Sequence, residues 1–304
     1  MTGPTLPEGT GVLLMGYGSP AGPEDLPGYL TEVLGGRAPS PELVREYTRR
    51  YTLIGWSPQL RITTSLRAKL EQRLARDGGA TRVYLGTKHW APHAADTIRD
   101  ASAEGVRRLV AVPLSPYASP WILAPYQRAI EAGKKQAPHP IEVELRSGWH
   151  TNPHWIAYWK ETLHRELARA PKGTVALLSA HSLPERHRAS GDPYPEILHE
   201  TVTHLVDAAR PPLWDFTYQS AGNTTEPWLG PDITEKMVEW RDRGHADQLV
   251  APIGFVFEHL EVLYDLDHVI REYADEHGVR YRRAPMPNDD DHVVEALRSV
   301  ALGA

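Results

Sequence analysis

One histidine follows an apolar run in the stretch TVALLSAHSLP, residues 174–184. Apolar runs of this length, bounded by glycine and proline, are typical of strands buried on both faces, so we expect His181 at the carboxyl end of a strand. In open α/β sheets ligands bind at that edge. An imidazole, with an unperturbed pKa of roughly 6.5, can accept a proton near neutral pH or ligate a metal ion. The structural alternative is a buried imidazole whose hydrogen bonds are satisfied.

An acidic stretch, PIGFVFEHLEVLYDLD, covers residues 252–267 at an expected junction between a strand and a helix. On an α-helix, Glu261, Asp265 and His268 occupy positions i, i+4 and i+7 and share one face. Such a stripe could pass a divalent cation inward, because carboxylate and imidazole groups are metal ligands. A solvated acidic helix face is the alternative interpretation.

A tyrosine is flanked by glycines in LLMGYGSP, residues 13–20, at the end of another apolar run. Gly16 and Gly18 would let a flat ligand approach the backbone while the Tyr17 phenol projects toward it. A nucleotide-binding loop is the competing interpretation. The spacing of Gly16, Gly18 and Gly22 does not fit G-x-G-x-x-G, which disfavours it.

The composition restricts the function further. The 304 residues include 33 Lys and Arg against 39 Asp and Glu, a net charge of −6, which gives no electrostatic footprint for nucleic acid. The absence of cysteine excludes disulfides, thiolate nucleophiles and Cys-ligated zinc or iron–sulfur sites. The N-terminal residues do not form a signal peptide, and no apolar run approaches the roughly 20 residues of a membrane helix. We therefore expect a cytoplasmic protein without stable membrane insertion.

The elements that must position these residues alternate along the chain. Apolar runs predict strands at residues 11–17, 82–88, 108–115, 141–149, 174–181, 214–220 and 248–255. Helical patterns lie at residues 58–76, 152–170, 195–209 and 234–244, and the closing residues 280–304 contain a short strand and a helical pattern at 290–301. This alternation predicts parallel α/β sheets.

The alternation also repeats. The strand ends at residues 13–20, 83–90 and 109–119 resemble, in order, those at 176–184, 216–223 and 249–258. The repetition predicts two similar α/β lobes: an N-terminal lobe of residues 1–160 and a C-terminal lobe of residues 161–304. We expect the last helix to pack back on the first lobe. Residues 20–58 have no counterpart in the second half, and are expected to form a lid segment of the N-terminal lobe.

Three motifs together resemble the ferrochelatase family, and the resemblance spans essentially the whole chain. They are SAHSLP at residues 179–184, YQSAGNTTEPWLGP at 218–231 and FVFEHLEVLYDLD at 255–267, in the family's order. The resemblance implies two Rossmann-like, chelatase-type lobes, each a parallel sheet flanked by helices, with a porphyrin cleft between them. It implies a lyase that inserts Fe²⁺ into a porphyrin without an organic cofactor and releases two protons. His181 and Glu261 would be the catalytic residues and metal ligands.

Within that family, the tyrosine of MGYGSP is similar to that of the coproporphyrin III ferrochelatases of Gram-positive-type bacteria. This likeness implies coproporphyrin III as substrate, Fe-coproporphyrin III (coproheme) as product in haem biosynthesis, and Tyr17 as a further metal ligand opposite His181. It also implies a monomer that passes its product to a coproheme decarboxylase. The substrate-binding residues carried over from the resemblance are Tyr17, Arg50, Tyr51, Ser57 and Tyr126.

Two positions depart from the family pattern. Leu34 stands where a basic residue is expected, so propionate binding would fall to other side chains: Arg37, Arg50, Ser57 or Lys88. Val269 stands where the helical stripe has its third acid.

Three other functions compete with this interpretation. Protoporphyrin IX is the alternative substrate. A non-enzymatic haem or porphyrin carrier would need no opposed His and Glu. A serine hydrolase built on Ser179 or Ser182 lacks the G-x-S-x-G turn.

Overall fold

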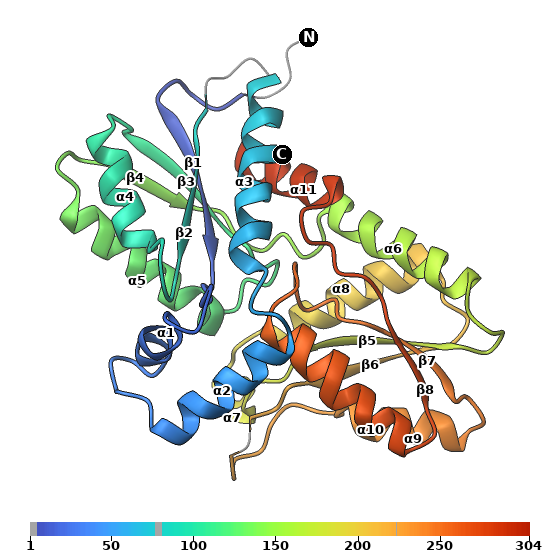
Figure 1. Cartoon of the computed structure of the whole chain (residues 1–304). Coiled ribbons are helices and arrows are strands. Elements are labelled where there is room, and N and C mark those ends of the chain that lie inside the picture. The colour runs from blue at the N-terminus through green and yellow to red at the C-terminus, as the bar shows by residue number, and fades with distance from the viewer. Residues whose placement is uncertain (1–4, 77–80, 223) are drawn as a thin grey trace. The chain divides into compact units, whose positions relative to one another are not determined.

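The structure is a computed structural model that describes residues 5–76, 81–222 and 224–304 (Figure 1). The chain forms two compact units: unit 1 is Met1–Trp149 with Asn288–Ala304, and unit 2 is His150–Pro287. The expected boundary between residues 160 and 161 falls inside helix α6 (Pro153–Ala168). Helix α6 packs against α8 and β7, so the whole helix belongs to unit 2. Among the described residues no helix is long and apolar enough to cross a bilayer.

Unit 1 contains a four-stranded parallel sheet with the strand order β2-β1-β3-β4. The strands are β1 (Thr10–Gly16), β2 (Val83–Thr87), β3 (Arg108–Pro113) and β4 (Glu142–Leu145). Every residue of β1 is buried, as expected for a central strand covered by helices on both faces. In Figure 1, α3 (Gln59–Arg76) and α11 (Asp291–Leu302) cover one face, and α4 (Ala94–Ala103) and α5 (Pro120–Gln136) cover the other.

The predicted lid segment, residues 20–58, contains two helices, α1 (Leu26–Val33) and α2 (Pro41–Leu53). The Ser40 side chain caps α2 by accepting a hydrogen bond from the Leu43 N–H at 3.2 Å, and Pro41 occupies the first turn. The start of α2 is therefore determined by the residues at the helix start itself, Ser40 and Pro41.

Helix α11 returns to unit 1 after the whole of unit 2. Charged groups fix it on α3: Lys69 Nζ lies 3.0 Å from Asp289, and Arg73 lies 3.1 Å from Asp291 and 3.2 Å from Glu295. The apolar face of α11, with Val293, Val294 and Leu297 fully buried, supplies the larger stabilisation.

Unit 2 contains a second four-stranded parallel sheet, with the order β6-β5-β7-β8. Its strands are β5 (Val175–His181), β6 (Trp214–Gln219), β7 (Asp247–Ala251) and β8 (Arg280–Arg283). Its other helices are α7 (Glu185–Ala189), α8 (Tyr194–Ala209), α9 (Ile233–Asp242) and α10 (Arg271–Glu276). Helix α6 packs on β7, α9 on β5 and β6, and α10 on β8. The two sheets have equivalent strand orders, which confirms the predicted pair of similar α/β lobes.

The acidic stretch forms a helix of a different kind from the one expected. Residues Glu261–Ile270 are a π-helix, η1, which continues directly into α10. Its i→i+5 hydrogen bonds widen each turn, so the predicted α-helical alignment of i, i+4 and i+7 is wrong here.

Candidate active site

His181 and Glu261, which the resemblance implies as a pair, lie together and both belong to unit 2. His181 is the last residue of β5 and Glu261 the first of η1, and His181 Nε2 lies 3.5 Å from Glu261 Oε2. Gly254 makes this approach possible, because a Cβ atom there would stand 2.7 Å from the Ala180 Cα atom. Its N–H donates to the Ser179 carbonyl at 3.1 Å, so the chain leaving β7 lies directly against the end of β5.

The ring of His181 has a defined orientation. Its Nδ1 makes a very short contact with the Ser182 carbonyl oxygen, which can only accept, so Nδ1 carries a proton and donates it. Nε2 therefore faces Glu261 and is the atom that can gain a proton or a metal ion. The Tyr194 hydroxyl donates to the His181 carbonyl at 3.0 Å and fixes the strand end from α8. The side chains of His181 and Glu261 are 27% and 42% exposed, so an incoming ligand can reach both.

The pair is electrostatically coupled. Burial alone would lower the pKa of His181, but the Glu261 carboxylate, its hydrogen bond and the Ser182 carbonyl outweigh burial and raise that pKa above its ordinary value. Burial alone would raise the pKa of Glu261, and the His181 imidazolium outweighs it and lowers that pKa. At neutral pH the pair is thus an imidazolium beside a carboxylate, holding one proton between them.

His259 prepares the start of η1. Its Nδ1 accepts the Glu261 N–H at 3.2 Å, and its ring centroid lies 4.5 Å from that of Phe255. Burial lowers the pKa of His259, so the ring is neutral and can act as this acceptor. This hydrogen bond satisfies the Glu261 N–H, one of the backbone donors that have no partner within a helix at its start.

The second acid of the helix is held by a residue that sequence reasoning did not single out. The Ser220 hydroxyl donates to Asp265 at 2.6 Å. Ser220 follows β6 with φ of 58°, a left-handed conformation that is uncommon for residues other than glycine. Ser220 stands within the quoted YQSAG motif, but nothing local in the sequence indicates this backbone conformation.

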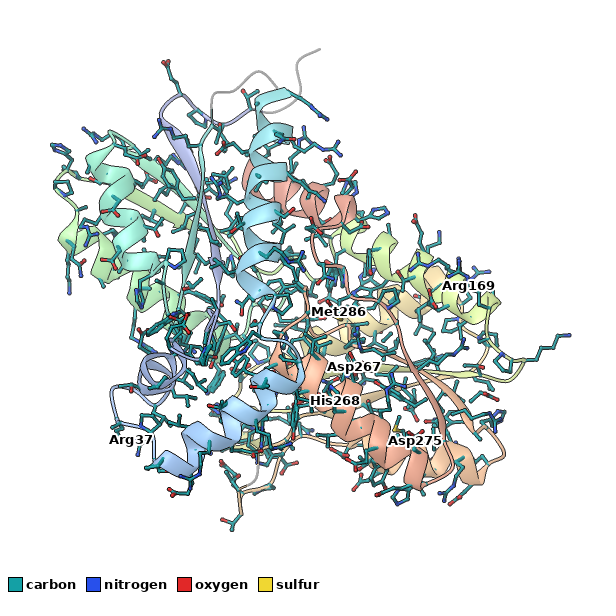
Figure 2. The ribbon with its side chains drawn as sticks, in the orientation of Figure 1. Arg37, Arg169, Asp267, His268, Asp275 and Met286 are labelled. Atoms are coloured by element: carbon teal, nitrogen blue, oxygen red, sulfur yellow. The ribbon has the colours of Figure 1, made fainter. Side chains whose placement is uncertain are left out.

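The outer part of η1 carries other interactions. The His268 ring lies 6.2 Å from that of Tyr264, and Val269 is 46% exposed. Asp267 and His268, labelled in Figure 2, project from neighbouring positions of this helix. Across residues 5–76, 81–222 and 224–304 no three His, Asp or Glu side chains converge as a preformed metal cage. The two groups that the structure does bring together are His181 and Glu261.

Unit 1 presents a different set of side chains at the carboxyl edge of its sheet. Tyr17 directly follows β1 and is 43% exposed. Its ring centroid lies 4.8 Å from that of His89, and Lys88 Nζ lies 4.9 Å from the Tyr17 ring centroid. Gly18 has φ of +96°, and a Cβ atom there would lie 1.4 Å from the His89 carbonyl oxygen. Glycine is therefore required for the turn that exposes the phenol.

Burial and neighbouring positive charge lower the pKa values of the two side chains beside Tyr17. Burial, and then the nearby Lys88 ammonium, lower the pKa of His89 to about 4. Burial and the positive charge of Arg128 lower the pKa of Lys88. His89 is consequently neutral at physiological pH, beside a cation that can attract an anionic ligand group.

Two of the predicted substrate-binding residues lie on or just after α2, and both are partly exposed. Arg50 Nε is 2.8 Å from Glu46, and its guanidinium lies 5.3 Å from the Tyr47 ring centroid. The Ser57 hydroxyl oxygen accepts the Gln59 N–H at 3.3 Å. Each therefore already has a partner within unit 1 that a bound carboxylate would have to share or replace.

The other two predicted substrate-binding residues are buried. Tyr51 is 2% exposed, with its ring stacked on Trp56 at 5.6 Å and an interplanar angle of 10°. Tyr126 is 5% exposed and belongs to the hydrophobic cluster formed around β1, α4 and α5, where burial raises the pKa of its phenol. The structure thus places Tyr126 in the core of unit 1, where it packs against apolar side chains such as Ile98 and Ile130.

Known proteins resemble this chain in sequence and in fold. The family model described as "Ferrochelatase" matches residues 9–303. The chain is 38% identical over 301 residues to "Coproporphyrin III ferrochelatase 1" of Bacillus cereus, covering 96% of each chain. It is 38% identical over 302 residues to "Coproporphyrin III ferrochelatase" of Anoxybacillus flavithermus, covering 96% of this chain and 95% of that one. Among solved structures, SirB from Bacillus subtilis with Fe³⁺ has a TM-score of 0.60 at 12% identity, covering 96% and 95% of the two chains, which shows a shared chelatase fold.

Proposed function

The chain belongs to the ferrochelatase family, and from this premise we propose that it inserts Fe²⁺ into coproporphyrin III to form Fe-coproporphyrin III in haem biosynthesis. The observation that carries the proposal is the pair of His181 and Glu261 at the carboxyl edge of the second sheet. An imidazole and a carboxylate at this distance can bind a ferrous ion together and can accept protons. Fe²⁺ is a substrate here, and the proposal requires no organic cofactor.

The reaction replaces two pyrrole N–H protons by one ferrous ion. In the resting protein the His181 imidazolium and the Glu261 carboxylate share one proton, as their opposite pKa shifts indicate. An arriving Fe²⁺ displaces that proton, because metal binding favours deprotonated ligands. As the metal moves to the porphyrin nitrogens, His181 Nε2 and the Glu261 carboxylate accept the two pyrrole protons, and release of one of them to solvent restores the resting pair. The sum is one Fe²⁺ and one porphyrin in, and one metalloporphyrin and two protons out.

The hydrogen bond to Ser182 supports this assignment of roles. It holds the Nδ1 proton of His181 on the side away from Glu261, which leaves Nε2 as the exchanging atom throughout. A flat porphyrin resists metallation, and binding energy spent on bending it would expose a nitrogen lone pair. We assign that distortion to the substrate site as a whole.

Tyr17 is proposed as the third metal ligand, acting on the product. Its phenol is exposed at the edge of the first sheet, with Lys88 beside its ring. A phenol has an unperturbed pKa of roughly 10 and is neutral until a bound metal lowers that value. We therefore expect Tyr17 to stabilise the bound product more than it accelerates metal insertion.

The substrate site is proposed to include Tyr17, Arg50 and Ser57, which bind the porphyrin rim and its propionates, with the buried Tyr51 packed behind them against Trp56. Arg50 and Ser57 supply a charged and a neutral donor, and both are partly exposed. Coproporphyrin III has four propionates where protoporphyrin IX has two, so a site with several carboxylate partners favours the former. Tyr126 contributes through packing behind this surface, given its burial.

The setting of the reaction is also proposed. We infer a cytoplasmic monomer that transfers coproheme to a decarboxylase, because the product of iron insertion still carries the propionates that such an enzyme would convert. Analytical ultracentrifugation at micromolar concentration should give a single species of about the 34.0 kDa chain mass.

Parallel anaerobic turnover with Fe²⁺ and either coproporphyrin III or protoporphyrin IX tests the proposal. We expect kcat/KM for coproporphyrin III to exceed that for protoporphyrin IX by about tenfold or more. Tenfold corresponds to about 1.4 kcal/mol in transition-state free energy. A preference for protoporphyrin IX would make that porphyrin the substrate. Tight binding of coproheme with no consumption of free Fe²⁺ would instead identify a carrier.

A further inference from the structure

Arg283 connects the last strand of unit 2 to the helix that carries Glu261. Arg283 ends β8, and its Nε and Nη2 atoms each lie 2.7 Å from an oxygen of Asp267. Nη2 also lies 3.4 Å from Glu258 Oε1. Only 11% of the Arg283 side chain is exposed, against 28% for Glu258 and 24% for Asp267. A bidentate, mostly desolvated guanidinium contact of this kind fixes direction as well as distance.

The two carboxylates stand on either side of Glu261 in the sequence. Glu258 precedes it by three residues and Asp267 follows it by six. One guanidinium therefore holds both ends of the segment within which Glu261 starts the π-helix. Removing it would leave two partly buried carboxylates without their shared counter-charge, and their repulsion would drive the two ends of the segment apart.

A second contact runs parallel to the first. The Arg271 guanidinium lies 4.9 Å from the centroid of the Tyr281 ring. Tyr281 and Arg283 are two residues apart on β8, so their side chains share one face of the strand. Asp267 and Arg271 are four apart on the facing helix. The strand and the helix thus meet at two successive contacts. The stronger of them is the ion pair of Arg283 with Asp267.

The π-helix needs such support. An i→i+5 helix is rare, and sequence propensity alone does not maintain it, so tertiary contacts must select it over the α-helical alternative. A change to α-helical winding between residues 258 and 267 would rotate the Glu261 carboxylate relative to the end of β5. The 3.5 Å approach to His181 depends on this winding.

We propose that Arg283 is a positioning residue for iron insertion: by binding Glu258 and Asp267 together, it sets the helical winding that places Glu261 against His181. The inference rests on the proposed function. Arg283 acts through Glu261 and does not touch the reacting atoms, so its effect must vanish when the Glu261 carboxylate is absent.

A double-mutant cycle between Arg283→Met and Glu261→Gln tests this dependence. Arg283→Met alone should lower kcat for iron insertion about tenfold, because small misplacements of a reacting group are costly, with KM for coproporphyrin III changed less than about twofold. In the Glu261→Gln background, Arg283→Met should change kcat by less than about twofold. Arg283→Lys, which keeps one charged contact, should recover most of the loss.

Arg280→Met is the matched control. Arg280 lies on the same strand and also makes a bidentate pair, with Asp247 at 2.8 and 2.6 Å, but its side chain is 67% exposed. Its loss should leave kcat unchanged within about twofold. If Arg283→Met does not fold, Asp267→Asn removes the bidentate pair with a smaller change and must give the same pattern.

The outcomes separate the two proposals. A wild-type chain that does not metallate coproporphyrin III at all contradicts the proposed function. Turnover by the wild type, combined with equal losses from Arg283→Met in both backgrounds or with no loss in either, overturns the positioning role. A loss confined to the background that retains Glu261 supports it.

Discussion

The carboxyl edges of the two sheets differ in chemistry although the strand orders are equivalent. The central strand of unit 1 is followed by an exposed phenol, Tyr17, beside Lys88 and the neutral ring of His89. The central strand of unit 2 ends in His181, paired with Glu261. The repeated frame positions side chains at one edge, and the residues following each strand decide what that edge does.

The two histidines illustrate this difference most directly. Burial by itself would lower the pKa of both rings, but the nearest charged group acts in opposite directions. The Lys88 ammonium lowers the pKa of His89 further, whereas the Glu261 carboxylate raises the pKa of His181. His89 is neutral at physiological pH and His181 carries a proton. The same residue type is thus suited to contacting a ligand in one unit and to exchanging protons in the other.

Removing the His181 imidazole should have the largest effect. His181→Ala should reduce iron insertion by about 10³-fold or more, since both a metal ligand and a proton acceptor are lost. Binding of coproporphyrin III, followed by fluorescence quenching, should remain within about threefold of wild type. Turnover near the wild-type rate would show that this edge is not the reacting one.

Glu261→Gln should be the next most severe change, with a loss on the order of 10²-fold in kcat. With the carboxylate gone, the largest influence that raises the pKa of His181 is lost, so that pKa should fall. NMR titration of the ring of His181 in the wild type and the variant measures this fall, and an unchanged midpoint would contradict the coupling.

Tyr17→Phe should have a small kinetic effect, with kcat within about threefold of wild type. The absorption spectrum of the bound Fe-coproporphyrin should nevertheless shift, because the phenolic oxygen is lost as a ligand. An identical spectrum would remove Tyr17 from the metal ligands and leave unit 1 with a binding role only.

The smallest effect concerns stability. The pKa of His89 lies below the unfolded value, so its neutral form stabilises the fold above pH 6.5, and this contribution is lost as pH falls from 6.5 toward about 4. His181, with a raised pKa, stabilises the fold below pH 6.5 and loses that contribution at alkaline pH. Lys88→Met should raise the pKa of His89 and reduce the acid-side loss by well under about 1 kcal/mol, measurable by urea denaturation at pH 5 and pH 7.

The sheets could be predicted because their signals are local. The run predicted at residues 174–181 is observed as Val175–His181, and that at 11–17 as Thr10–Gly16. Buried parallel strands are apolar throughout and are bounded by turn residues, so a single sequence reveals them. The residues at their ends, Tyr17 and His181, follow from the strand limits.

The remaining features depend on distant partners. The winding of η1 is not encoded in its own periodicity, and Arg283, which contacts it, lies 16 residues beyond Asp267. The burial of Tyr126 results from packing with α4, which no local pattern indicates. Sequence reasoning singled out His181 and Glu261, which the structure brings together, but not the residues that hold them.

The return of α11 to unit 1 has a consequence for biosynthesis on the ribosome. Unit 2 is complete in sequence at Pro287, whereas the α3 surface that binds Asp289, Asp291 and Glu295 stays uncovered until α11 has been translated. The middle of the gene can therefore produce a finished unit while the older N-terminal segment still exposes apolar surface. Nascent chains should consequently need protection by chaperones chiefly along α3 and β3.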